Sequence, residues 1–437
     1  YYFDFEIKDK SQRLIKKIFT AACTKSLCHA AMKIRKINLP WGVMCGIRPA
    51  KNVRLLLEEG YSDSKIEEIF KKIYEVSSEK IKLAHTVAKN EEKLLNEIGK
   101  NSVSIYIGIP FCPTRCLYCS FVSTDIRVSG KYMDEFIEKL LLEIDKTAQI
   151  TEKLGAYAEN IYIGGGTPTT LSAQQLTMIF ERLKKNFDFS KIKEFTLEAG
   201  RPDTITEEKL IAAKNGGVNR ISINPQTMNE ETLKRVGRTH TPQMVKKSFD
   251  MARKVGFDNI NMDLIAGLPG ENVEMFKKSL DEVIELDPEN ITVHSMCIKR
   301  AADLKRNIDR LTDSEMMNEM LSYTQKRMKE TKREPYYMYR QKNSSGNLEN
   351  VGYAAEGLEC LYNILIMEEI TDIVGIGAGS SCKLIKKNPE GSEKPFRIER
   401  TENVKNVDEY ISRIDEMIDR KRDSYGNNEN KDYYRDD

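Results

Sequence analysis

The sequence predicts an α/β fold in which a partial (β/α)6 barrel is flanked by a helical N-terminal region and a mainly helical C-terminal region. Six short apolar or β-branched runs lie between residues 103 and 296, and each adjoins a segment with helical periodicity. The flanking regions lack this alternation. Because parallel strands need helical crossovers, the pattern favours a parallel sheet. Six units are too few for a closed eight-stranded barrel, and an open doubly wound sheet is the alternative.

Residues 1–100 are expected to form a helical accessory region. Apolar residues recur at three- and four-residue spacing in SKIEEIFKKIYEV and again in KIKLAHTVAKNEEKLLNEI. The segment between these two helices contains Trp41, the only tryptophan, together with glycine and proline breaks. The pattern predicts the secondary structure of this region but does not indicate its function.

Residues 101–300 are expected to form the barrel. The first helix should bury Met133, Phe136, Ile137, Leu140, Leu141 and Ile144 and expose the acidic side chains between them. Ser172–Gln175 is a capping box, and the helix that begins at Asn272 should end before Pro288. The six expected strands are 103–109, 160–163, 194–198, 220–224, 259–266 and 291–296.

Residues 301–437 should form a further, mainly helical domain that ends in a polar, frayed tail.

Composition describes a protein with a sizeable core and balanced charge. The chain has 437 residues, and its 69 lysines and arginines nearly equal its 67 aspartates and glutamates, so no basic stripe predicts a nucleic-acid partner. No apolar run approaches the roughly 20 residues of a membrane span, and the N-terminus does not resemble a signal peptide. An odd number of cysteines, three of them clustered, is typical of a reducing compartment. We therefore expect a cytoplasmic protein.

Three cysteines lie close together in IPFCPTRCLYCSF, where Cys112, Cys116 and Cys119 have the spacing Cys-x₃-Cys-x₂-Cys. They follow the strand 103–109, and the loops at the carboxyl ends of barrel strands carry the chemistry in α/β barrels. Buried core thiols and a zinc site with a distant fourth ligand are alternatives. We expect a [4Fe–4S] cluster with three protein ligands, whose open iron can chelate S-adenosylmethionine for one-electron cleavage. None of the four histidines lies near these cysteines in the sequence. They are His29, His85, His240 and His294.

A run of glycines ends the second strand, in YIGGGTPT at residues 162–169. Glycines there let a ligand approach backbone amides near a helix N-terminus, although a phosphate loop or a plain tight turn has the same pattern. Glu198, Gln226 and Asp263 lie at the carboxyl ends of later strands. Several polar residues on one rim predict a site.

These features together resemble radical S-adenosylmethionine enzymes. The segments YIGIPFC, GGGTP, NRISINPQ, VGRTH and MDLIAGLPG resemble the oxygen-independent coproporphyrinogen III dehydrogenase family, and both flanks resemble its HemZ-type subgroup. The resemblance implies a [4Fe–4S] cluster on the three cysteines, a tetrapyrrole substrate, and an external one-electron donor of flavodoxin or ferredoxin type. It also implies that Tyr118 packs near the adenine and that S-adenosylmethionine contacts Tyr106, Gly165, Gly166, Thr167, Glu198, Gln226, Arg238 and Asp263.

One position departs from the decarboxylases of this family, because Phe121 stands where they have a fourth cysteine. A phenylalanine at this position resembles the pattern of the haem chaperones instead. The leading hypothesis is oxidative decarboxylation of coproporphyrinogen III propionates, and the alternatives are a haem chaperone and a radical methyltransferase that opens the haem ring. Substrate carboxylates would need cations, and a haem could be bound by His240 or His294. The candidate cations are Arg220, Arg238, Lys299 and Arg300.

Overall fold

The computed structural model describes residues 12–34, 39–44, 46–297, 312–341, 344–389, 392 and 396–426. Cys45, Lys299, Arg300 and the expected polar tail beyond residue 426 lie outside these residues. The helices are α1 (Gln12–Ile34), α2 (Pro49–Glu58), α3 (Asp63–Glu68), α4 (Ser78–Leu95), α5 (Ile126–Ser129), α6 (Met133–Lys153), α7 (Ala173–Asn186), α8 (Glu207–Asn215), α9 (Glu230–Arg235), α10 (Pro242–Val255), α11 (Val273–Glu285), α12 (Ser314–Glu330), α13 (Leu361–Glu368), α14 (Val407–Ser412) and α15 (Ile414–Gly426).

An eleven-stranded sheet forms the centre of the fold, with the order β13-β12-β11-β1-β4-β5-β6-β7-β8-β10-β9. A short parallel pair, β2 and β3, stands apart from it. The strands are β1 (Ser102–Ile109), β2 (Phe111–Cys112), β3 (Thr124–Asp125), β4 (Tyr157–Gly165), β5 (Glu194–Glu198), β6 (Arg220–Ser222), β7 (Ile260–Ala266), β8 (Asn290–Ser295), β9 (Glu334–Arg340), β10 (Glu349–Ala354), β11 (Asp372–Ile376), β12 (Ser381–Lys387) and β13 (Phe396–Glu402).

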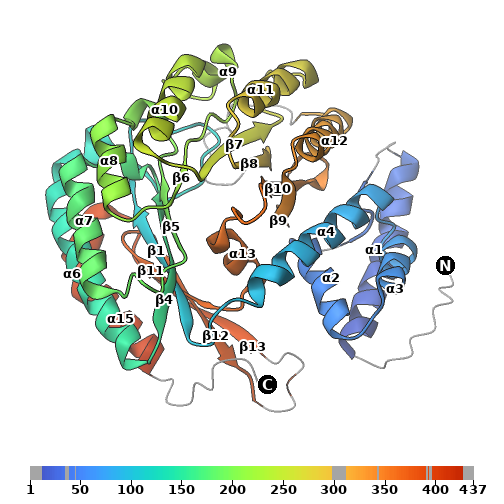
Figure 1. Ribbon diagram of the computed structural model, residues 1–437. Coiled ribbons are helices and arrows are strands. Elements are labelled where there is room, and N and C mark those ends of the chain that lie inside the picture. Colours follow the sequence, from blue (N-terminus) through green and yellow to red (C-terminus); the bar gives the residue numbers. More distant parts are fainter. Residues whose placement is uncertain are drawn as a thin grey trace.

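The six predicted barrel strands are present as β1, β4, β5, β6, β7 and β8, and all neighbours among them are parallel. They follow one another across the sheet in chain order, without the reversal that defines a doubly wound sheet. The sheet curves, and α6, α7, α8, α10 and α11 lie around its outer side (Figure 1). The partial barrel is therefore confirmed over the open doubly wound alternative.

The outer helices follow the predicted patterns. All six apolar positions predicted for α6 are buried. Ser172 and Gln175 form the reciprocal hydrogen bonds of a capping box at the start of α7, and Asn272 caps α11, which ends at Glu285 before Pro288.

The region after residue 300 contains more strand than its helical pattern suggested. Antiparallel β10 and β9 extend the sheet beyond β8, while β11 pairs with β1 in parallel and carries β12 and β13 at the other edge. These strands pair with edges made by residues far away in the sequence. Their partners cannot be read from local periodicity.

The N-terminal helices join the sheet through a buried polar group. Trp41 Nε1 donates to Glu349 Oε2 over 2.6 Å, and Lys80 Nζ lies 2.7 Å from Glu349 Oε1. Burial raises the pKa of Glu349, but the charge and hydrogen bond of Lys80 outweigh it and hold the pKa below its usual value. The single tryptophan therefore links residues 1–100 to β10.

Helix α13 lies inside the curve of the sheet, between β4 and β9 (Figure 1). Its N-terminus is capped by buried Glu194 of β5, which accepts from the backbone N–H groups of Leu361 and Tyr362 at 2.8 and 3.2 Å. Tyr362 in turn stacks on Tyr162 with ring centroids 4.6 Å apart. This helix closes the barrel interior on one side. In the part of the chain described, no helix is long and apolar enough to cross a membrane.

Candidate functional site

All of the predicted cluster and cofactor residues line one cavity of about 530 Å³ at the carboxyl ends of the parallel strands. Tyr106 comes from β1, Cys112 from β2, and Cys116, Tyr118 and Cys119 from the loop that follows. Gly165 ends β4 and is followed by Gly166 and Thr167, Glu198 ends β5, Gln226 follows β6, Arg238 follows α9, and Asp263 lies in β7. The topology thus brings together residues that are spread over more than 150 positions.

The three cysteines share a buried environment on the cavity wall. Cys112 and Cys116 are 9% and 8% exposed, and Cys119 is partly buried. Burial raises the pKa of the Cys112 and Cys119 thiols, and the neighbouring cysteines add to the effect at both. Thiolates in such a place need a bound cation to compensate them, as metal binding does.

The glycine run lies against the loop that carries Cys112. A Cβ atom on Gly166 would stand 2.6 Å from the Phe111 carbonyl oxygen and 3.0 Å from Cys112 Sγ. The Gly166 and Thr167 amides donate to the carbonyls of Ile109 and Phe111 at 2.7 and 2.8 Å. Because both amides are engaged, they are not the free donors of a phosphate loop. The run holds Cys112 in place and leaves room for its sulfur.

The donor set suits a cluster better than a single ion. In the described residues, no three His, Cys, Asp or Glu side chains are arranged to hold one metal ion. Cluster thiolates bind separate irons and need not converge on one point. Three buried thiols on one cavity, next to a glycine that leaves space at Cys112 Sγ, fit a [4Fe–4S] cluster with one iron open to the cavity.

Two carboxyl groups of the cavity, Glu198 at the end of β5 and Asp263 in the middle of β7, have opposite pKa shifts. Burial, reinforced by the charge of Asp263, raises the pKa of Glu198 to about 7, although Tyr162 donates to Glu198 Oε1 at 2.9 Å. Burial also acts to raise the pKa of Asp263, but the nearby His294 ring, 3.7 Å away, outweighs it and the pKa falls. Opposite shifts in one cavity are typical of a functional site.

The Gln226 backbone is held in an unusual conformation at the rim. Its φ is 66°, in the left-handed region that non-glycine residues seldom adopt. Gln226 N–H donates to the Asp263 carbonyl, and Ile265 N–H donates to the Gln226 carbonyl. These two bonds tie the residue to β7 and fix it in the cavity wall.

Arg238 is engaged by the protein itself. Its buried guanidinium donates to the Tyr118 hydroxyl at 3.0 Å and to the carbonyls of Asn224 and Gly200 at 2.8 and 3.3 Å. The residue therefore orients Tyr118, which came from the cysteine loop, toward the strand ends. It is a poor candidate for a free cation that recognises a substrate carboxylate.

The two candidate histidines differ in position. His294 lines the cavity, with Nε2 3.7 Å from Asp263 Oδ2 and Nδ1 3.4 Å from the Tyr339 hydroxyl. His240 is buried outside the cavity lining, where burial and the charge of Arg238 lower its pKa to about 3. Only His294 could face a bound ligand.

Phe121 lies where the cavity meets solvent. It lines the cavity and is still 66% exposed, which is unusual for a large apolar side chain. The position that departs from the decarboxylases therefore belongs to the site rather than to the core.

The sequence did not single out several cavity residues. Arg201 follows β5 in EAGRPD, three residues after the predicted Glu198, and that placement just beyond a strand end was a usable signal. Cys297 follows β8 in the same way. Tyr337, Tyr339 and Tyr362 also line the cavity but come from the region after residue 300, where nothing in the local sequence indicated a contact with the barrel.

Comparison with known proteins agrees with this arrangement. The profile of the radical SAM superfamily matches residues 106–283. The chain is 40% identical to the oxygen-independent coproporphyrinogen-III oxidase-like protein HemZ of Bacillus subtilis, over 88% of this chain and 77% of that protein. It is 33% identical to the heme chaperone HemW of Lactococcus lactis, over 64% of this chain and 69% of the relative.

A solved structure has the same fold. The coproporphyrinogen III oxidase HemN from Escherichia coli superimposes with a TM-score of 0.58 and 22% identity, covering 76% of this chain and 73% of HemN.

Proposed function

This chain belongs to the radical SAM superfamily, in the group that contains HemZ and HemW, and we propose that it is a radical enzyme acting on a tetrapyrrole. Its cofactors are the [4Fe–4S] cluster and S-adenosylmethionine that this superfamily uses. The proposed reaction is oxidative decarboxylation of coproporphyrinogen III in haem biosynthesis. Each reacting propionate loses a hydrogen atom, carbon dioxide and one electron and becomes a vinyl group; the hydrogen leaves on 5′-deoxyadenosine and the electron passes to an acceptor.

The observation that carries the proposal is the single cavity that contains every residue implied by the family resemblance. Cys112, Cys116 and Cys119 would bind the cluster. When bound, the cluster and S-adenosylmethionine together supply a one-electron cleavage that yields methionine and a 5′-deoxyadenosyl radical. The electron that reduces the cluster would come from a flavodoxin- or ferredoxin-like donor. A cytoplasmic location is part of the proposal, and the odd number of cysteines with three of them clustered supports it.

The protein's own part is positioning and exclusion of water. Glu198 and Asp263 present carboxyl groups to a cationic cofactor, and Arg238 holds Tyr118 over the strand ends. Tyr106 and Tyr162 stack, with ring centroids 6.1 Å apart, on the interior wall. An aromatic wall shields a reactive carbon radical while the target carbon is held close, and this chemistry needs no side-chain base.

Two cations in the cavity suit a substrate with several carboxylates. Arg220 of β6 is 1% exposed and lines the cavity, and its guanidinium has no hydrogen bond or ion pair to any described residue. Its Nε atom is buried without a partner. Lys383 of β12 also lines the cavity without an ion pair among the described residues, and burial lowers its pKa to about 8. A bound carboxylate would accept hydrogen bonds from either group, in addition to the attraction that Arg220 already has from the buried Glu194.

Haem binding without turnover is the second candidate function. It is favoured by Phe121, which is exposed at the cavity mouth in place of a cysteine, and by the similarity to a heme chaperone. In that case His294 is the ring available for the iron, at the cost of its contacts with Asp263 and Tyr339.

Anaerobic turnover separates these functions. Coproporphyrinogen III, S-adenosylmethionine, a reductant and an electron acceptor are incubated with reconstituted protein, and products are identified by mass spectrometry. The decarboxylase should give protoporphyrinogen IX, with deoxyadenosine formed in proportion to vinyl groups. Tight haem binding and transfer to an apoprotein, with coproporphyrinogen unchanged, would establish the chaperone instead. Loss of the haem Soret band only with S-adenosylmethionine and reductant would establish a ring-opening enzyme.

Replacing Arg220 by methionine should raise the KM for coproporphyrinogen about 10- to 100-fold, as the loss of a charged hydrogen bond worth ~1.5–3 kcal/mol implies. Methionine keeps the apolar stem and removes the charge. Arg220→Lys should recover part of the affinity. Iron content and slow cleavage of S-adenosylmethionine without substrate should remain as in the wild type. An unchanged KM in a fully loaded Arg220→Met protein would remove this residue from substrate recognition.

Binding of S-adenosylmethionine should weaken as the pH falls below about 7. The pKa of Glu198 in the free protein is about 7, and a cationic ligand lowers it. Binding therefore prefers the ionised form, and affinity should fall by up to about tenfold per pH unit below that pKa. Titration calorimetry between pH 6 and 8.5 measures this, and Glu198→Gln, which cannot ionise, should lack the dependence. Equal pH profiles for both proteins would contradict the role of Glu198.

A further inference from the structure

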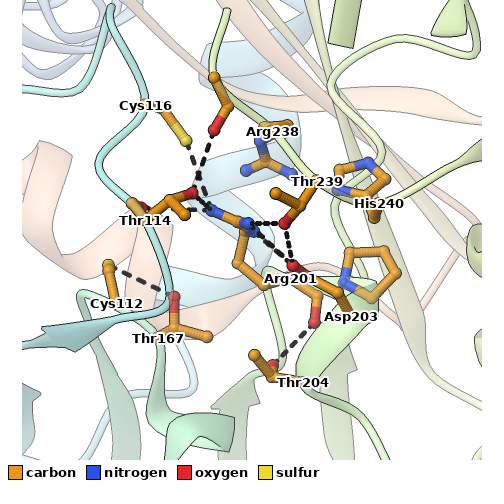
Figure 2. A network of polar contacts seen from close by, with 12 residues as sticks. Cys112, Thr114, Cys116, Thr167, Arg201, Asp203, Thr204, Arg238, Thr239 and His240 are labelled. Carbon is orange, nitrogen blue, oxygen red and sulfur yellow. Dashed lines mark hydrogen bonds and ion pairs between the residues drawn. The ribbon is translucent and has the colours of Figure 1, made fainter. Parts of the chain in front are cut away.

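Arg201 is the centre of a polar network at the cysteine loop (Figure 2). The residue follows Gly200 at the end of β5 and is 3% exposed. Its Nε and Nη2 donate to the two carboxylate oxygens of Asp203 at 3.0 and 2.9 Å, and Nη2 also donates to the Thr239 hydroxyl at 2.9 Å. This bidentate pairing fixes the plane of the guanidinium.

The remaining nitrogen of Arg201 points at the cysteine loop. Nη1 donates to the Thr114 hydroxyl at 3.1 Å and lies 3.8 Å from Cys116 Sγ, a distance suitable for a hydrogen bond to sulfur. Figure 2 shows these contacts converging on one guanidinium. A permanently charged donor therefore stands beside one of the three expected cluster ligands.

The same network joins three separate segments of the chain. Thr114 Oγ1 donates to the Gly237 carbonyl at 3.0 Å, and the Leu117 amide donates to the Val236 carbonyl at 3.1 Å. Thr239 Oγ1 donates to Asp203 Oδ2 at 2.5 Å. The cysteine loop, the loop after β5 and the segment after α9 are thereby held together around Arg201.

The three cysteines have different electrostatic surroundings. Cys116 faces Arg201 and also interacts with the buried guanidinium of Arg238. Cys112 has the neutral Thr167 hydroxyl at 3.4 Å. Cys119 interacts with the charges of Arg115 and Arg238 but has no contact with Arg201. Among the three ligands, only Cys116 therefore has the Arg201 guanidinium within hydrogen-bonding distance of its sulfur, in a buried region where electrostatic effects are strong.

We propose that Arg201 is a positioning residue that holds Cys116 in its ligating orientation and raises the reduction potential of the cluster. Reduction adds an electron, so a cation or a hydrogen bond at a ligand sulfur stabilises the reduced state. Asp203 balances part of the charge. The hydroxyls of Thr114 and Thr239 also accept from Arg201, so an uncharged asparagine at position 203 removes the negative charge while the guanidinium stays in place. The inference rests on the proposed cluster ligands and is independent of which tetrapyrrole the protein uses.

Redox titration followed by electron paramagnetic resonance tests this in reconstituted protein without S-adenosylmethionine. Arg201→Gln should keep the wild-type iron content and shift the potential to more negative values. The expected shift corresponds to about a tenfold change in the ratio of oxidised to reduced cluster, ~59 mV for one electron. Arg201→Lys should restore part of it. Asp203→Asn removes the balancing negative charge and should shift the potential in the opposite direction.

The controls separate charge from structure. Arg182→Gln removes a guanidinium paired with Asp145 on the outer helices and should leave the potential unchanged. A wild-type potential in iron-loaded Arg201→Gln would overturn the proposal. If Arg201→Gln binds no iron, Asp203→Asn decides, because an unchanged or more negative potential there also overturns it. Failure of the wild-type protein to bind iron would refute the ligand set instead.

Discussion

Replacing Cys112, Cys116 or Cys119 by alanine should reduce the iron bound after anaerobic reconstitution from about four per chain to near background, because a cubane held by three thiolates cannot lose one and remain stable. Cleavage of S-adenosylmethionine should disappear with the iron. All three thiols line the same cavity, and the glycine run holds Cys112 from the other side. Iron analysis, the visible absorption spectrum and deoxyadenosine formation with dithionite measure the result.

The matched controls are cysteines outside this cavity. Exposed Cys23 and buried Cys382 should be replaceable by alanine without loss of iron, as should Cys28 and Cys360. Cys45 lies outside the described residues, and its replacement is expected to be tolerated from the sequence alone. Retention of the wild-type iron content in any of the three cavity variants would show that its thiol is not a ligand. Stoichiometric zinc without iron uptake would refute the cluster itself.

Replacing Gly166 by valine should abolish cluster loading and also destabilise the fold. The new Cβ would stand 2.6 Å from the Phe111 carbonyl oxygen, a rigid backbone atom, and 3.0 Å from Cys112 Sγ. Relief of the first contact must move the loop that carries Cys112. Overpacking of this kind costs ~1–3 kcal/mol of unfolding free energy. Urea unfolding of the iron-free protein and iron analysis after reconstitution measure the two effects separately.

Gly130→Ala is the control for this substitution. Its added Cβ would meet only Ile126 Cγ1 at 3.4 Å, an ordinary contact, and the protein should fold and bind iron normally. A Gly166→Val protein that binds the full amount of iron would show that the glycine run does not position Cys112.

The Arg238 and Arg220 side chains show that residue type alone does not predict which arginine is available to a substrate carboxylate. Both were plausible cations for a substrate carboxylate. In the structure Arg238 uses its donors on Tyr118 and two backbone carbonyls, whereas Arg220 has no such partner among the described residues. The difference depends on where the loops after β6 and α9 lie, and no local pattern encodes it.

The sequence by itself determined the alternation of strands and helices, the cysteine spacing and the rim residues Glu198, Gln226 and Asp263. These depend on local periodicity and on the rule that parallel strands end on one side of a sheet, so neighbouring residues suffice to reveal them. Only the tertiary structure decided that β9–β13 extend the same sheet, that α13 closes the barrel interior, and that Arg201 reaches Cys116. Each of these is a contact between segments far apart in the chain, and its energy comes from packing and charge that exist only after the segments meet.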